Sequence, residues 1–166
     1  KDKLAFAFRT AKEATECYNR FDKTICVSEF VKNDFCSIMD YKGDVSVLYN
    51  TIESENVIML GQEKEGLPKD DGKIRLIAVG TLKESKGYGR LLKIIRKLLT
   101  EKYPIHLYIL GKGPMKKDIE QYVKENGMDN EVTLLGYQTN PYKYVANCDL
   151  FVCASFAEGF STAATE

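Results

Sequence analysis

Two glutamates near the end of the sequence could bind a ligand from both sides. Glu158 and Glu166 enclose seven residues, and Ser161 or Thr162 between them can cap a helix. The free N–H groups at such a helix start suit a phosphate. Glu166 is then expected about one and a half turns inside the helix. Carboxylates before and beyond the helix start could accept hydrogen bonds from hydroxyl groups flanking the phosphates, a layout that matches a nucleotide sugar.

One lysine far upstream could complete such a site. Lys86 follows the apolar run 74–79, which reads as a buried strand. An ammonium group near a strand end can pair with an anionic ligand. A single lysine at a helix start, or any random pair of glutamates, is more often simply solvated. The fold must therefore bring these side chains together for the interpretation to hold.

Strands and amphipathic helices alternate along the chain. Strands are expected at 24–27, 45–49, 74–79, 105–110, 131–135 and 150–154, and helices at 4–19, after Ser28, after Gly87, from Pro114 to Gly127 and at 142–146. This order predicts an α/β fold, a Rossmann-like parallel sheet with helices on both faces. Ligands of such sheets bind outside the carboxyl ends of the strands.

Three glycines mark that edge of the predicted sheet. Gly80, Gly111 and Gly136 each end a strand. Glycine lets the backbone turn sharply and approach a ligand closely. Any one of them alone would indicate only a tight turn, but the three together favour a binding face.

Composition excludes several classes of function. The 166 residues carry 24 basic and 24 acidic side chains, so no general attraction to nucleic acid is indicated. Residues 83–126 hold eleven Lys/Arg and five Asp/Glu, which indicates either the solvated faces of two helices or a region suited to an anionic ligand. The only histidine, His106, lies within an expected strand, so a histidine-rich metal site is excluded.

Cysteine usage and hydropathy indicate a cytoplasmic protein. The five cysteines are odd in number and lie mostly in apolar runs, as expected for buried thiols in a reducing compartment. The sequence shows no apolar run long enough to span a membrane and no signal peptide pattern.

The segment from Glu158 to Glu166 resembles the E-x7-E motif of family 4, or group 1, retaining glycosyltransferases. That motif alone is weak, but further resemblances follow in the family's order along most of the chain. They are Val27-Ser28-Glu29, residues 49–53, Val79-Gly80-Thr81-Leu82 with Lys86-Gly87, the Gly-x-Gly-Pro turn ending residues 108–114, residues 132–136 and residues 148–152.

The resemblance implies two Rossmann-like domains that face a cleft, with the donor held mainly by the C-terminal one. Residues 1–50 would be the remnant of the acceptor-side domain, and residues 51–72 the linker. Residues 73–166 would form the donor-binding domain, incomplete at its C-terminus. The fragment alone is expected to lack turnover.

The resemblance also implies roles for individual residues. Lys86 would contact the donor diphosphate and Glu158 the transferred sugar, making these two the catalytic pair, while Glu166 would contact the ribose. The expected binding set is Gly80, Thr81, Lys86, Gly111, Gly113, Gly136, Glu158, Gly159, Phe160, Ser161 and Glu166. Thr81 departs from the family pattern, because many members have arginine there.

The activity implied is transfer of a sugar from a nucleotide-sugar donor, a UDP-sugar, to a glycan or lipid-linked acceptor with retention of configuration. The family needs no metal or cofactor, and the absent N-terminal domain would allow peripheral association with the inner face of the membrane.

Two alternatives stay open. A non-catalytic α/β domain that binds a nucleotide or a protein would also use glycine-edged strands. An NAD-dependent oxidoreductase would use the turn 111–114, although Lys116 stands at its third glycine position. Lys86 and Glu158 pointing into one cleft would favour catalysis.

Overall fold

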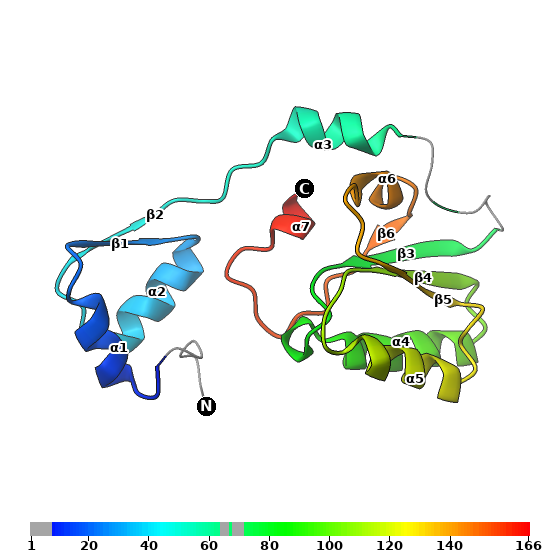
Figure 1. The fold of residues 1–166 in the computed structure, drawn as a ribbon, viewed down its shortest axis with the longest axis horizontal. Coiled ribbons are helices and arrows are strands. Elements are labelled where there is room, and N and C mark those ends of the chain that lie inside the picture. The colour runs from blue at the N-terminus through cyan, green and yellow to red at the C-terminus, as the bar shows by residue number, and fades with distance from the viewer. Residues whose placement is uncertain (1–7, 64–66, 68–71) are drawn as a thin grey trace. The chain divides into compact units, whose positions relative to one another are not determined.

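The computed structural model describes residues 8–63, 67 and 72–166, which belong to two compact units (Figure 1). The first unit is the described part of Lys1–Thr51 with Gly159–Thr162, and the second is the described part of Ile52–Glu158 with Ala163–Glu166. The start of the expected helix 4–19 and most of the expected linker after residue 63 lie outside the described residues.

The first unit pairs two parallel strands with two helices. Its elements are α1 (Ala11–Tyr18), β1 (Lys23–Cys26), α2 (Glu29–Ile38) and β2 (Asp44–Val47), and β1 pairs with β2 in parallel. The Ser28 hydroxyl accepts a hydrogen bond from the Val31 amide, so Ser28 caps α2 as the sequence predicts. Edge-on ring contacts of Phe35 with Tyr18 and Tyr41 pack this unit.

The second unit contains a four-stranded parallel sheet. Its strands are β3 (Ile74–Val79), β4 (Ile105–Leu110), β5 (Val132–Gly136) and β6 (Leu150–Phe151), in the order β5-β4-β3-β6. The bounds of β3 and β4 match the sequence prediction, because both strands are mostly apolar and largely buried. β6 is shorter than the predicted 150–154, because the chain beyond it turns to bond the loop after β3.

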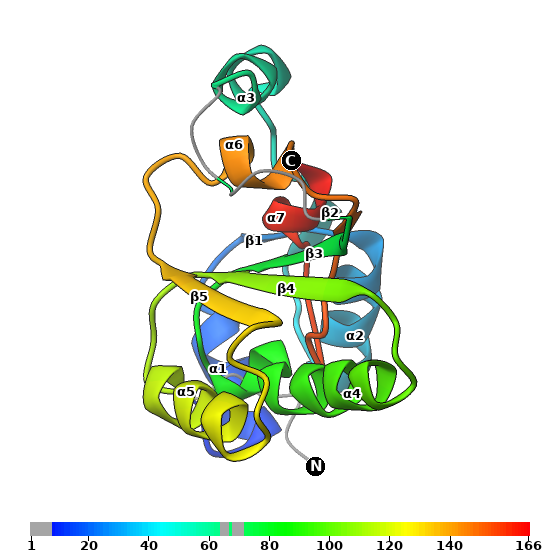
Figure 2. The same ribbon diagram turned by 90° about the vertical axis from the view of Figure 1, so that its right-hand side faces the viewer.

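Helices cover both faces of this sheet (Figures 1 and 2), which confirms the predicted α/β fold. α4 (Tyr88–Thr100) and α5 (Lys116–Glu125) lie on one face, over a large core that includes Leu92, Ile95 and Ile119. On the opposite face, residues of α6 (Tyr142–Val145) pack against a smaller core of Ile77, Tyr108 and Leu110. Burial of apolar side chains from both faces is what holds the parallel sheet.

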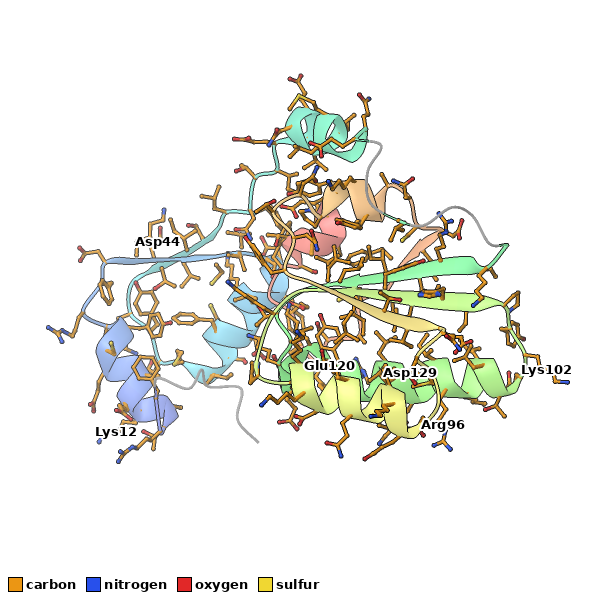
Figure 3. The ribbon with its side chains drawn as sticks, turned by 45° about the vertical axis from the view of Figure 1, so that its right-hand side comes forward. Lys12, Asp44, Arg96, Lys102, Glu120 and Asp129 are labelled. Atoms are coloured by element: carbon orange, nitrogen blue, oxygen red, sulfur yellow. The ribbon has the colours of Figure 1, made fainter. Side chains whose placement is uncertain are left out.

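The charged residues of α4 and α5 face solvent. Figure 3 labels Arg96 on α4 and Glu120 on α5, and both side chains are exposed. Part of the surplus of basic residues in 83–126 therefore lies on the solvated outer faces of α4 and α5, as the simpler interpretation of the sequence expected.

Two short helices differ from the sequence expectations. α3 (Ser54–Gly61) lies within the segment expected as a linker, and it docks on α6, with the Asn140 side-chain amide donating to the Leu60 carbonyl at 3.0 Å. Its apolar run is too short to show a helical period, so tertiary contact decides its structure. α7 (Thr162–Thr165) is a single turn. No helix in the described part of the chain is long and apolar enough to cross a bilayer.

The strand order fixes where a ligand site should lie. The chain runs from β3 through β4 to β5 in one direction and then returns to β6 on the other side of β3. The strand order therefore reverses between β3 and β6, whose carboxyl ends lie side by side. Such a topological switch point is where open α/β sheets bind their ligands.

Candidate functional site

Lys86 is placed by the loop after β3. A single turn of 3-10 helix, η1 (Glu84–Lys86), ends at Gly87, which has a φ of 70°. A Cβ atom at Gly87 would come within 2.0 Å of the Ala154 carbonyl oxygen. Only glycine combines this backbone conformation with so close an approach. The loop that carries Lys86 therefore closes directly onto the chain that leaves β6.

The loop that carries Glu158 is held by Arg90, which lies in the first turn of α4. The Arg90 guanidinium donates from Nε to the Ala154 carbonyl at 2.8 Å and from Nη2 to the Ser155 carbonyl at 2.7 Å. It also lies 4.5 Å from the centre of the Phe156 ring. The Phe156 amide in turn donates to the Ser85 carbonyl at 2.9 Å. The loops after β3 and β6 are thus tied together beside the switch point.

Lys86 and Glu158 form an ion pair within this junction, although they are 72 positions apart in the sequence. Lys86 Nζ lies 2.6 Å from Glu158 Oε1, and the two side chains are 27% and 26% exposed. Partial burial by itself would raise the pKa of Glu158. Hydrogen bonds from Lys86 and Ser155, with the charges of Lys86 and Lys83, outweigh that effect and hold the pKa below its usual value. Glu158 is therefore a carboxylate at neutral pH.

A hollow of about 350 Å³ lies at the carboxyl ends of β3, β4 and β5. Gly80, Thr81 and Gly111 line it, as the sequence predicted for the glycine-rich edge. A Cβ at Gly80 would lie 3.9 Å from Lys86 Cε, so the ion pair adjoins the hollow. A Cβ at Gly111 would meet the Gly80 carbonyl oxygen at 1.9 Å, so glycine is also needed there for the two strand ends to approach. Gly136 accepts from the Gly111 amide at 2.8 Å.

Gly113 packs against the loop after β3, and its expected contact with the donor stays a prediction. A Cβ on this residue would meet the backbone of Leu82 at 2.4 Å, and Gly113 is not among the residues that line the hollow. The Leu82 amide donates to the Lys112 carbonyl, and the Met115 amide donates to the Leu82 carbonyl, both at 3.0 Å. The Gly-x-Gly-Pro turn therefore packs against the loop after β3, which accounts for Gly113 without any cofactor.

Gly159, Phe160 and Ser161 belong to the first unit. The Ser28 hydroxyl donates to the Gly159 carbonyl at 2.9 Å. The Phe160 ring lies 6.2 Å from the ring of Tyr49. Their expected contact with donor phosphates stays a prediction.

Glu166 directly follows α7 (Thr162–Thr165), and the expected position one and a half turns inside that helix stays a prediction. Glu166 lines a second hollow, of about 340 Å³, with residues of α3 and α6. Partial burial, the charge of Glu166 and a hydrogen bond to it raise the pKa of Tyr142. The structure thus brings Lys86 and Glu158 together and places Glu166 elsewhere in the same unit; its contact with ribose stays a prediction.

The sequence analysis missed three residues that build this site. Arg90 and Ser155 position Glu158, and Tyr88 donates from its hydroxyl to the Gly80 carbonyl at 3.2 Å. Burial, with a smaller effect of Cys153, raises the pKa of Tyr88 to about 12, so the hydroxyl stays protonated. The partners of Arg90 and Tyr88 are backbone carbonyl groups, which carry no sequence signal.

A parallel sheet with helices on both faces and paired charges at its switch point defines a Rossmann-like binding domain. The model of the family "Glycosyl transferases group 1" matches residues 61–166, and this chain belongs to that family. The family resemblance seen in the motifs is thereby confirmed.

Known relatives agree with this assignment. A Campylobacter jejuni N-acetylgalactosamine-N,N'-diacetylbacillosaminyl-diphospho-undecaprenol 4-alpha-N-acetylgalactosaminyltransferase is 37% identical over 120 residues, covering 72% of this chain and 31% of that protein. The chain thus spans about a third of the length of this curated relative.

Two solved structures share the fold. A crystal structure of an S. aureus TarM mutant with Fondaparinux, alpha-GlcNAc-glycerol and UDP has a TM-score of 0.73 at 18% identity, covering 95% of this chain and 31% of that one. Anabaena HepE in complex with UDP and glucose has a TM-score of 0.68 at 20% identity, covering 90% of this chain and 42% of that one.

Proposed function

We propose that this chain binds the nucleotide-sugar donor of a retaining glycosyltransferase, and that the donor is a UDP-sugar. The observation that carries the proposal is the Lys86–Glu158 pair at the switch point, beside the hollow at the ends of β3, β4 and β5. The pair places one cation and one carboxylate together beside this hollow, as transfer of a sugar from a diphosphate would use.

Each member of the pair has a distinct role in this proposal. Charge builds up on the diphosphate as the bond to the sugar breaks, and the Lys86 ammonium can stabilise that charge. The Glu158 carboxylate can accept hydrogen bonds from hydroxyl groups of the transferred sugar. In the free protein each group neutralises the other, so donor binding exchanges one partly buried ion pair for contacts to the ligand.

The nature of the donor and acceptor is supported by the relatives. TarM and HepE have crystal structures that contain UDP. The name of the C. jejuni relative describes transfer of N-acetylgalactosamine to a saccharide on diphospho-undecaprenol. We propose that this protein likewise uses a UDP-sugar donor and a glycan or lipid-linked acceptor, and that it acts at the inner face of a membrane. Retention of configuration rests on the family resemblance.

We propose transfer to the acceptor only for a protein that spans the full length of these relatives, of which this chain covers about a third. Within these 166 residues the proposal concerns the donor. Contacts of Phe160 and Ser161 with the phosphates, and of Glu166 with the ribose, are parts of the same proposal.

Calorimetric titration with UDP, GDP and ADP tests the proposal. We expect UDP to bind most tightly, and Lys86→Ala to weaken it by roughly tenfold because a charge-assisted contact is lost. Lys93→Ala is the matched control, since Lys93 is an exposed lysine of α4. If no nucleotide binds at millimolar concentration, or if Lys86→Ala and Glu166→Ala both leave binding unchanged, the site assignment is wrong.

A further inference from the structure

Glu158 has two hydrogen-bond partners of different kinds at the junction of the loops after β3 and β6. Lys86 is a cation, with Nζ 2.6 Å from Glu158 Oε1, and the Ser155 hydroxyl forms a second hydrogen bond to the same carboxylate. In the proposed function Lys86 also binds the donor diphosphate, so its contact with Glu158 is shared once the donor is bound. Ser155 is uncharged, and a diphosphate attracts it less strongly than it attracts an ammonium group.

The backbone around Ser155 is fixed relative to the loop that carries Lys86. The Arg90 guanidinium donates to the Ser155 carbonyl at 2.7 Å. The amide of the next residue, Phe156, donates to the Ser85 carbonyl at 2.9 Å, and Ser85 directly precedes Lys86 in η1. The Ser155 hydroxyl therefore extends from anchored backbone, as a group that orients another side chain must.

The direction of the hydrogen bond between Ser155 and Glu158 follows from their chemistry. A hydroxyl group can donate one hydrogen bond and accept two, whereas a carboxylate can only accept. Because Glu158 is a carboxylate at neutral pH, Ser155 is the donor. The Cys153 thiol donates to Ser155 Oγ at 3.7 Å, which occupies an acceptor position of the hydroxyl and leaves its proton for Glu158.

We propose that Ser155 is the positioning residue that holds Glu158 in the donor complex, when Lys86 turns to the diphosphate. Its hydroxyl fixes the orientation of the Glu158 carboxylate and keeps it ionised, so that the carboxylate can accept hydrogen bonds from hydroxyl groups of the transferred sugar. This assignment rests on the proposed function. It separates the two partners of Glu158 into one that is shared with the donor and one that stays.

Burial explains why Glu158 needs a partner that stays. Partial burial raises the pKa of Glu158, and hydrogen bonds from Lys86 and Ser155, with the charges of Lys86 and Lys83, reverse that effect. When the Lys86 ammonium is shared with phosphates, its effect on Glu158 weakens, and the negative charge of the diphosphate disfavours a second negative charge nearby. The bond from Ser155 then opposes protonation of Glu158, and an ionised acceptor binds sugar hydroxyl groups more strongly than a neutral one.

Calorimetric titration of the whole chain with UDP and UDP-glucose tests this assignment. Ser155→Ala removes the hydroxyl but keeps the backbone carbonyl that Arg90 binds. It should weaken UDP-glucose by about fivefold, because the carboxylate is less well oriented, and leave UDP within about twofold. Ser155→Thr keeps a hydroxyl and should bind UDP-glucose within about twofold of the unsubstituted chain.

An NMR titration of the Glu158 carboxyl group separates positioning from a direct contact of Ser155 with the sugar. In Ser155→Ala the pKa of Glu158 should rise in the free chain, because a hydrogen bond to the ionised form is lost. The rise should be larger with UDP bound, because Lys86 is then shared with the diphosphate. A hydroxyl that only contacted the sugar would leave the pKa of Glu158 in the free chain unchanged.

Ser37→Ala is the matched control for Ser155→Ala. The Ser37 hydroxyl donates to the Asp34 carbonyl at 2.7 Å within α2, which belongs to the first unit. Its removal should change neither the affinity for UDP-glucose nor the pKa of Glu158. Circular dichroism of each variant shows whether the fold is retained.

The outcomes separate this assignment from the proposed function. If Glu158→Gln weakens UDP-glucose while Ser155→Ala binds it like the unsubstituted chain, this assignment is overturned alone. If Ser155→Ala weakens UDP-glucose without changing the pKa of Glu158, or weakens UDP equally, Ser155 does not act through Glu158 and the positioning role is also overturned. If the unsubstituted chain binds neither ligand, the proposed function falls and this assignment with it.

Discussion

The two glutamates of the E-x7-E segment have very different surroundings in this molecule. Glu158 lies in a loop held by Arg90 and by the approach of Gly87 to Ala154, and it is paired with Lys86. Glu166 follows a single helical turn, and Tyr142 is the hydrogen-bond partner that the structure gives it. Membership of one motif therefore does not give the two carboxylates the same surroundings, because Glu158 is paired with Lys86 whereas Glu166 lies beside residues of α3 and α6.

Of the substitutions near Glu158, Gly87→Ala should lower the free energy of unfolding most. The new methyl group would meet the Ala154 carbonyl, and alanine is strained at a φ of 70°. We expect a loss of about 3 kcal/mol or more in the free energy of unfolding, measured by urea denaturation.

Gly127→Ala provides the matched control for this substitution. Gly127 has a φ of 62° but no atom within 4 Å of the added Cβ, so backbone strain alone remains. Its cost should be only about 1–2 kcal/mol. Equal losses for the two variants would mean that close packing of the loops at Gly87 contributes nothing.

Arg90→Ala should loosen the loop that carries Glu158. It removes two hydrogen bonds to carbonyl groups and the contact with the Phe156 ring. We expect a loss of about 1–2 kcal/mol in the free energy of unfolding. Arg96→Ala, on the exposed face of the same helix (Figure 3), should change it by less than about 0.5 kcal/mol. If Arg90→Ala lowers the free energy of unfolding no more than Arg96→Ala does, Arg90 does not hold the loop that carries Glu158.

Acid should weaken the Lys86–Glu158 pair. Because the pKa of Glu158 is lowered in the folded state, its stabilising contribution is present above its unfolded pKa and is lost as the pH falls through the folded pKa. Glu158→Gln should therefore cost about 1 kcal/mol at pH 7, and the difference from the unsubstituted chain should shrink below the usual glutamate range. Denaturation curves from pH 7 to about pH 3 measure this. A constant difference would show that Glu158 is not stabilised as a carboxylate.

Glu166→Gln should have the smallest effect on stability. We expect a change below about 0.5 kcal/mol in the free energy of unfolding, because Glu166 is exposed. The pKa of Tyr142 should fall towards its usual value, because the negative charge beside it is removed. An NMR titration of the tyrosine rings measures this shift. If Glu166→Gln lowers the free energy of unfolding as much as Glu158→Gln does, the two carboxylates do not differ in their contribution to stability.

Sequence patterns predicted the parts of this structure that are built from mostly apolar runs. β3 and β4 were bounded correctly, and the strand-end glycines Gly80 and Gly111 line one hollow. α3 was missed because a short helix is fixed by docking rather than by its own periodicity.

The anchors of the site were harder to find from the sequence. Arg90 bonds carbonyl groups 64 and 65 positions away, and backbone carbonyls carry no sequence signal. The pairing of Lys86 with Glu158 was expected only as a shared location, from motifs that sit at the ends of two strands. Which side chain stands over which carbonyl depends on the packing of the two loops, and that packing appears only in the structure.

The most direct test of the central claim measures UDP and UDP-glucose binding by calorimetry for Lys86→Ala and Glu158→Gln. If the pair holds the diphosphate and the sugar of one donor, Lys86→Ala weakens both ligands, and Glu158→Gln weakens UDP-glucose while leaving UDP within about twofold. If both variants bind both ligands as tightly as the unsubstituted chain does, the ion pair is a structural contact and the donor site lies elsewhere.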